Sequence, residues 1–187
     1  NQSGINRDDN YLMGYLCYAI NNYKCAIEYL EKVMTTKDSL YQNAAYHLGL
    51  AYINTGQKNF AQKAFYDAYS LDFDTLIKED ALFNYAKLSY ELDNDPYNIA
   101  ISALQKYIEA YPTSIRTNEA QELILNLLMI SSNYQRVIDI IEQLPKKNLT
   151  IENMYQRACL NQALLDFKDR QYNKSIPREL FCLFCSS

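Results

Sequence analysis

The sequence has few of the residues that break or reverse a chain. Its 187 residues include no tryptophan, one histidine, four glycines and four prolines. So little glycine and proline argues against disorder and against many tight turns, because these residues dominate both. With 49% hydrophobic and 21% charged residues, the composition is that of a globular protein with its apolar residues in long elements. At this length one ordinary domain is expected.

The sequence also lacks the features of several other classes of protein. A net charge of −4 and a pI near 5.1, with scattered lysines and arginines, create no field that would attract nucleic acid. No apolar run approaches the roughly 18 residues that a membrane-spanning helix needs, and residues 1–10 are too polar for a signal peptide. We therefore expect no nucleic-acid partner and no membrane span.

The five cysteines are odd in number and irregularly spaced. They do not indicate a disulfide framework, and we expect at least one thiol outside any disulfide. Cys182 and Cys185 form a CxxC pair, but a zinc site needs four ligands, and no second CxxC or nearby histidine supplies the others. The redox form of the motif begins a helix in a βαβ unit, which the sequence lacks. No metal site and no cofactor are expected.

No residues form a recognisable catalytic constellation. The single histidine, His47, has no Ser, Cys or Asp at helical spacing to orient or activate it, as general-base catalysis requires. We therefore expect a structural or exposed histidine and no enzyme. Paired acids such as Asp8-Asp9 and Glu79-Asp80 fall where helices are expected to begin, and capping and the helix dipole explain them there.

What the sequence does have is an internal repeat. Gly14 lies 35 positions before Gly49, and Ala26 lies 35 positions before Ala61. Short side chains then recur at steps of 39, 37 and 38 positions, at Ala100, Val137 and Ser175. Near-repeats of this length indicate stacked structural units with short insertions between them.

Each unit carries two stretches of helical periodicity separated by a short polar break. In the second unit the apolar faces run from Ala44 to Tyr52 and from Ala61 to Ala68, with the break NTG between them. The pattern predicts two antiparallel helices, with Gly49 and Ala61 small because the backbones approach there. The predicted helices span about 8–20, 23–35, 41–54, 58–71, 77–92, 96–110, 116–131, 134–144, 150–169 and from 171 onward.

The second unit resembles the tetratricopeptide repeat (TPR), a helix-turn-helix unit of about 34 residues. The matching positions are Leu48, Gly49, Tyr52, Gly56, Ala61, Phe65 and Ala68. The resemblance covers residues 7–176 and implies an all-α, right-handed superhelical solenoid in a single domain, 1–187. Its five helix-turn-helix units would span about 7–40, 41–75, 77–114, 116–147 and 150–187, the last one irregular.

The end of the chain departs from the repeat. Pro177 falls about five residues into the last expected helix, where proline lacks the hydrogen-bond donor and clashes with the preceding turn. The apolar, cysteine-rich stretch PRELFCLFCSS follows. Two interpretations stay open: an altered or truncated end of a longer array, or a short final helix that begins late and caps the core.

In TPR proteins the first helix of each unit lines a concave face, so the resemblance predicts a binding groove. The residues assigned to it are Tyr11, Tyr15, Tyr18, Asn43, Tyr46, Leu50, Phe83, Lys87, Tyr90 and Asn126. Aromatic anchors beside amides suit an extended or helical peptide. TPR proteins that clamp a C-terminal carboxylate place Lys and Asn where Tyr11 and Tyr15 stand, so that type of ligand is not expected.

The sequence therefore favours a non-catalytic scaffold that binds a protein or peptide in this groove. Two alternatives stay open: a structural or self-associating segment of a longer repeat array, and a glycan-binding envelope protein. The run at 81–114 is similar to multi-repeat TPR proteins of Bacteroidetes, which favours a bacterial periplasmic or cell-envelope location over a cytoplasmic one. In exported proteins of that group, Asp-Ser/Thr-aliphatic sites carry O-glycans, so Ser39 and Thr75 are candidates for this modification.

Overall fold

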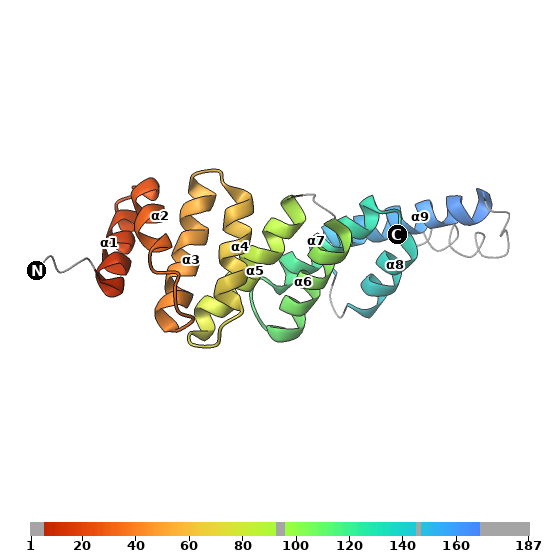
Figure 1. The fold of residues 1–187 in the computed structure, drawn as a ribbon. Coiled ribbons are helices and arrows are strands. Elements are labelled where there is room, and N and C mark those ends of the chain that lie inside the picture. Colours follow the sequence, from red (N-terminus) through yellow and green to blue (C-terminus); the bar gives the residue numbers. More distant parts are fainter. Residues whose placement is uncertain (1–5, 93–95, 145–146, 169–187) are drawn as a thin grey trace, which may run out of the picture. The chain divides into compact units, whose positions relative to one another are not determined.

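The computed structural model describes residues 6–92, 96–144 and 147–168, which form nine α-helices and no strand. In chain order (Figure 1) these are α1 (Arg7–Ala19), α2 (Tyr23–Glu31), α3 (Ser39–Asn54), α4 (Lys58–Tyr69), α5 (Thr75–Glu91), α6 (Pro96–Ala110), α7 (Thr117–Ile130), α8 (Tyr134–Gln143) and α9 (Leu149–Lys168). The predicted all-α fold class is confirmed. The second helix of the fifth unit, the CxxC pair and the tail 177–187 lie outside the described residues.

The helices begin and end close to the ranges predicted from periodicity. The largest difference is at α2, which ends at Glu31 rather than near residue 35. Beyond it, the N–H groups of Val33 and Met34 donate to carbonyls three residues back. The chain therefore continues as tight turns in place of another α-helical turn.

Acidic side chains cap several helix starts. Asp38 and Asp74 accept hydrogen bonds from N–H groups in the first turns of α3 and α5, so both helices begin two residues before their predicted ranges. Asp9 takes part in a reciprocal capping box at α1, which confirms the capping role predicted for it. The same prediction for Asp80 is wrong, because α5 begins earlier, at Thr75, and the Asp80 carboxylate contacts the side chains of Tyr46 on α3 and of Arg116 just before α7.

The turns after α1, α3 and α7 share one C-terminal cap. Each places a residue at positive φ: Asn21 at 60°, Gly56 at 75° and Ser132 at 58°. The N–H of that residue and the N–H of the next both donate to carbonyls in the last helical turn, which is the pattern of a Schellman motif. This cap ends the first helix of a hairpin and starts the reversal into the second.

The repeated small residues lie where the two helices of a hairpin meet. A Cβ atom built on Gly14 would lie 2.6 Å from Cγ of Leu30, and one built on Gly49 would lie 2.7 Å from Cε1 of Phe65. Real Cβ atoms do not approach other carbon atoms so closely. The predicted close approach at Gly49 is confirmed. The group that approaches Gly49 is the buried ring of Phe65 and not the backbone of the facing helix.

One polar side chain in each of the first two units holds the loop that leads to the next unit. Arg7 donates to carbonyls just beyond α2 and forms an ion pair with Asp38. Gln42, 35 positions later and fully buried, donates to carbonyls at the end of α4 and in its loop, and accepts from the N–H of Asp74 at 2.7 Å. An arginine and a glutamine at the same repeat position thus each hold, by hydrogen bonds, the loop that leads to the next unit.

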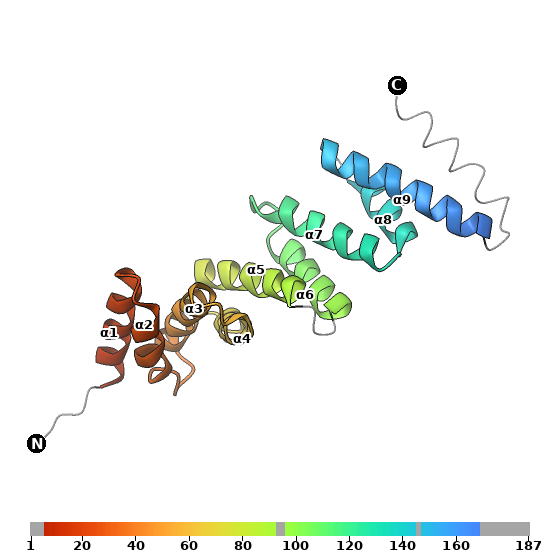
Figure 2. The same cartoon turned by 90° about the horizontal axis from the view of Figure 1, so that it is seen from above.

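By its internal contacts the chain divides into two compact units, 1–120 and 121–187, with the boundary inside α7. In the first, each helix from α1 to α6 packs against the next (Figure 2), around a core that includes Leu30, Phe65 and Leu104. In the second, α8 packs against α9 around Val137 and Ile141. A single domain over 1–187 stays a prediction.

The hairpin of α1 and α2 is crosslinked by a disulfide between Cys17 and Cys25, whose Cα atoms are 5.7 Å apart. Their spacing in the sequence did not predict this bond, because only the reversal between the helices brings the two thiols together. Cys159 is a buried thiol in α9.

Candidate functional site

Helices α1 and α3 bring four tyrosines around the only histidine of the chain. Tyr11, Tyr15 and Tyr18 recur at i, i+4 and i+7 of α1 and so share one face. Their ring centroids lie 6.3, 5.1 and 5.4 Å from that of His47, and the Tyr46 centroid lies 5.4 Å from it. All four contacts are edge-on, an arrangement that aromatic pairs favour. We call these five residues the Tyr–His cluster.

A backbone contact sets the orientation of the imidazole. The Nδ1 atom of His47 lies 2.8 Å from the carbonyl oxygen of Asn43, one turn earlier in α3. Because a carbonyl only accepts, Nδ1 carries the hydrogen, and Nε2 of the neutral ring is an acceptor. Burial lowers the pKa of His47 below its ordinary value of 6.5, so the ring is neutral at pH 7.

Three phenol groups of the cluster are available for further hydrogen bonds. Within the described part of the chain, the hydroxyls of Tyr11, Tyr15 and Tyr18 have no protein hydrogen-bond partner, and Tyr15 is 43% exposed. Burial raises the pKa of Tyr11 and of Tyr18, so both phenols stay protonated at neutral pH. The cluster therefore combines aromatic contact area with hydroxyl groups that can donate and accept.

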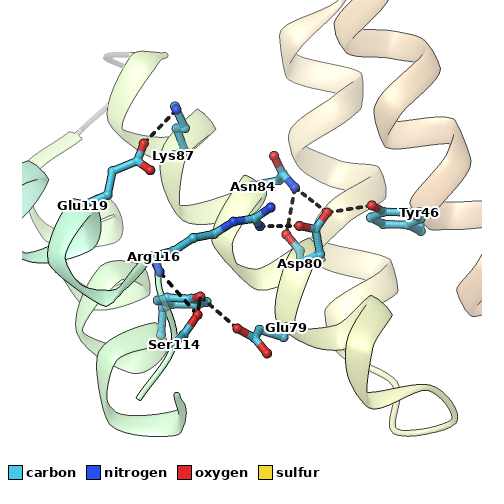
Figure 3. Close-up of polar contacts among 9 residues, drawn as sticks. Tyr46, Glu79, Asp80, Asn84, Lys87, Ser114, Arg116 and Glu119 are labelled. Carbon is cyan, nitrogen blue, oxygen red and sulfur yellow. Dashed lines mark hydrogen bonds and ion pairs between the residues drawn. The ribbon is translucent and has the colours of Figure 1, made fainter. Parts of the chain in front are cut away.

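The fourth tyrosine joins this cluster to a polar network on α5, shown in Figure 3. The Tyr46 hydroxyl donates to Oδ2 of Asp80 at 2.6 Å, and the Asn84 amide donates to the same oxygen at 2.9 Å. Arg116 forms an ion pair with Oδ1 of Asp80, and its guanidinium carbon lies 4.9 Å from the centre of the Phe83 ring. The pKa of Tyr46 is raised, mainly because the phenol is buried and to a smaller extent because it donates a hydrogen bond to Asp80.

A second ion pair lies beside this network. Lys87 of α5 contacts Glu119 of α7 at 2.9 Å (Figure 3). Arg116 and Lys87 are thus both paired with carboxylates of the chain itself. These polar contacts link the first helices of successive hairpins, α3 to α5 and α5 to α7. The phenols of Tyr11, Tyr15 and Tyr18, by contrast, have no protein hydrogen-bond partner within the described residues.

The predicted groove residues on α1 and α3 lie close together. Tyr11, Tyr15, Tyr18 and Tyr46 surround His47, as described above. Asn43 supplies the carbonyl that orients the imidazole, and its own amide donates to the carbonyl one turn earlier. Leu50 is half-buried on α3.

The remaining predicted groove residues differ more in their surroundings. Phe83 is only 4% exposed, and its ring contacts Tyr107 and Arg116. Lys87 is ion-paired, and Tyr90 is half-buried on α5. Asn126 is half-buried in the part of α7 that belongs to the compact unit 121–187. Binding by all ten residues stays a prediction.

His47 and Arg116 are the residues that sequence reasoning missed. We expected His47 to be structural or merely exposed, and the structure places it half-buried at the centre of the tyrosines. No periodicity within α3 could reveal this, because three of its four ring partners come from the preceding unit. Arg116 precedes α7, outside the positions that the repeat assigns to the groove.

The described residues contain no group of three or more His, Cys, Asp or Glu side chains that could hold a metal ion. Among the described helices, none combines the length and the apolar character needed to cross a membrane.

No protein-family model matches the chain, and no curated protein matches its sequence. Solved structures do match. MamA from AMB-1 superimposes with a TM-score of 0.58 at 15% identity, over 94% of this chain and 89% of that one. YrrB, described as a TPR protein with an unusual peptide-binding site, gives a TM-score of 0.55 at 12% identity, over 99% of this chain and 89% of that one.

A third match comes from Podosopora anserina. This structure, of nearly identical TPR-like repeats of a putative kinesin light chain, superimposes with a TM-score of 0.52 at 13% identity. The match covers 94% of this chain and 92% of that one. Identities this low establish the fold alone. Together with the helix pairs, the small-residue contacts and the repeated caps, they show that this chain has the fold of the tetratricopeptide repeat proteins.

Proposed function

We propose that this chain is a non-catalytic scaffold that binds a peptide or a protein segment at the Tyr–His cluster. The observation that carries the proposal is the contrast between two sets of polar groups. The phenols of Tyr11, Tyr15 and Tyr18 have no hydrogen-bond partner within the described residues, while Lys87 on α5 and Arg116 just before α7 are ion-paired. Tyrosines of this kind give large contact area at small entropic cost.

The geometry also favours binding over catalysis. The side chains around His47 are phenols, and Nδ1 is occupied by a backbone carbonyl in place of a carboxylate that would raise its basicity. An acceptor at Nε2 beside three phenols suits the N–H and C=O groups of an extended peptide. YrrB, which has the same fold, is named for a peptide-binding site.

The test begins with peptides selected from a random library against the intact chain. Tyr15→Ala should weaken the selected peptides about tenfold or more, because exposed aromatic anchors carry much of the energy of such contacts. Tyr15→Phe, which keeps the ring, should lose less. The matched control is Tyr66→Ala, since Tyr66 is 49% exposed on α4 and contacts other rings.

The single histidine provides a site-specific readout. Its Hε1 proton signal in NMR spectra should shift when a selected peptide binds. If the peptides bind without moving this signal, and Tyr15→Ala leaves their affinity unchanged, the site assignment is wrong. An oligosaccharide that shifts the His47 signal where no peptide does would support the glycan-binding alternative instead.

A second candidate function is that of a segment in a longer or self-associating array. One face of α1 and its C-cap favours it, because Leu12, Leu16 and the C-cap residue Ile20 recur at i, i+4 and i+8 and are 49–72% exposed. In a repeat array such a stripe is normally covered by a preceding unit. Light scattering that shows only monomer over a wide concentration range would count against self-association.

A further inference from the structure

A pocket of about 340 Å³ opens between α2, α3 and α4, within the compact unit 1–120. Met34, Leu48 and Ala64 supply its apolar surface, and the carboxylates of Glu31 and Asp67 lie among its lining groups. The aromatic lining residues are Tyr41, Tyr52 and Phe60.

This pocket lies on the side of α3 that faces away from the proposed binding face. Tyr41, Leu48 and Tyr52 recur at i, i+7 and i+11 and share one face of the helix. Tyr46 and Leu50 lie about half a turn around α3 from them. The pocket is therefore separate from the Tyr–His cluster and does not depend on the function proposed for it.

The acidic groups of the pocket stand directly beside aromatic rings. The Tyr52 hydroxyl donates to Oε1 of Glu31 at 2.5 Å, and the Phe60 ring stacks on Tyr52 with centroids 5.5 Å apart. Phe60 is 59% exposed, which leaves one face of the stack open. The pKa of the Tyr41 phenol is raised, mainly by burial and to a smaller extent by the charge of Asp67 and a hydrogen bond to it. Carboxylates at phenol hydroxyls, with an exposed aromatic ring in the same pocket, form a site that favours a cation.

The next hairpin shows what fills the corresponding place. Between α4, α5 and α6, the rings of Tyr66, Tyr69 and Tyr85 contact one another, and Nζ of Lys106 lies 4.8 Å from the centre of the Tyr69 ring. Lys106 comes 39 positions after Asp67, the same spacing that separates Ala100 from Ala61. The corresponding place between α4, α5 and α6 thus carries a cation of the chain itself, where this pocket carries a carboxylate.

The pocket has one positively charged lining residue, Lys63, against the two carboxylates. Lys63 is exposed, and the structure shows no ion pair between it and Glu31 or Asp67 among the described residues. The balance of charge in the pocket is therefore negative, and its volume is open.

We propose that this pocket binds the basic side chain of a lysine or arginine from a partner polypeptide. The charged end contacts the carboxylates of Glu31 and Asp67, and the aliphatic stem lies against Met34 and the ring of Phe60. The site is then the intermolecular counterpart of the contact that Lys106 makes within the chain.

The test uses methyl NMR of the intact chain labelled at its four methionines. The probe is a Gly-Arg-Gly peptide with blocked ends, and the matched peptide carries citrulline, which is neutral and has the same shape. The Met34 signal should shift with the arginine peptide, while the signals of Met129 and Met154, in the compact unit 121–187, stay in place. Absence of the Met34 shift, or an equal shift with the citrulline peptide, would overturn the proposal.

Variants separate a built site from general attraction to an acidic protein. Glu31→Gln and Asp67→Asn should each weaken binding about tenfold, and Lys63→Met should strengthen it. The control is Glu28→Gln, an equal change of charge on the same helix at a residue paired with Lys32. If Glu28→Gln weakens binding as much as Glu31→Gln, the pocket is not the site.

A further control separates this inference from the proposed function. Tyr15→Ala should leave the Met34 titration unchanged, because Tyr15 lies on α1 in the Tyr–His cluster. Melting curves by circular dichroism establish that each variant is folded. A Met34 response that depends on Tyr15 would place the peptide in the cluster and remove the evidence for the pocket.

Discussion

His47 shows how the properties of one side chain depend on residues from another repeat. Its pKa is lowered because tyrosines from α1 and α3 exclude water from the imidazole. The helix that carries it would leave most of the ring solvated if it stood alone. A residue that looks unremarkable in the sequence thus becomes the centre of an aromatic surface.

This environment predicts a pH dependence of stability. Because the folded-state pKa of His47 is lower than its ordinary value of 6.5, the unfolded chain binds more protons as the pH falls through that value. The free energy of unfolding should therefore decrease from pH 7.5 to pH 5. His47→Leu should reduce that decrease and leave the part that carboxylates cause.

NMR titration of the single histidine measures the pKa directly. A midpoint at or above 6.5 in the folded chain would contradict the predicted direction. Binding of a selected peptide should lower the midpoint further if the peptide removes more water from the ring.

At the scale of elements, the hairpin turns are built on one backbone conformation with three different residues. Gly56 adopts positive φ without a steric cost, while Asn21 and Ser132 adopt it as residues that carry a Cβ. Asn21 has a local compensation, because its side-chain oxygen accepts from the Tyr23 hydroxyl at 2.7 Å. Ser132 accepts only a long contact of 3.3 Å from Tyr134.

These differences predict unequal effects of glycine at the three turns. Ser132→Gly should raise the free energy of unfolding by about 0.5–1 kcal/mol, because removal of the Cβ relieves more strain than the added chain entropy costs. Asn21→Gly should change it little, and Gly56→Ala should lower it by about 1 kcal/mol. Chemical denaturation followed by circular dichroism measures all three, and a loss of stability in Ser132→Gly would contradict the argument.

At the scale of the whole molecule, stability in a repeat protein comes from each unit and its contacts with its neighbours. The two compact units, 1–120 and 121–187, have their own cores. A local defect in one hairpin should therefore be felt most strongly in that hairpin and in the helices packed against it.

Gly49→Ala provides the test of this expectation. A Cβ there would meet the buried Phe65 ring at 2.7 Å, and such overpacking costs about 1–3 kcal/mol. Amide hydrogen exchange should become faster in α3 and α4, while protection in α8 and α9 stays the same. Equal loss of protection throughout would show that the chain unfolds as one cooperative body.

The helices, their pairing and the solenoid class could all be predicted from the amino-acid sequence alone. These features depend on local periodicity and on small residues such as Gly14 and Gly49 that recur at a fixed spacing. Helix ends were predicted less well where a cap sets them, as Asp38 and Asp74 do for α3 and α5.

Which side chains share a surface depends on how the helices pack against one another. The contacts of His47 with Tyr15, of Asp80 with Arg116 and of Lys106 with Tyr69 each join residues from different elements of the fold. No pattern within one helix determines them, because the rotation and spacing of packed helices follow from the shapes of all the side chains between them. The face where Tyr15 stands was predictable from its repeat position, but the neutral imidazole beside it, and the acidic pocket behind α3, were not.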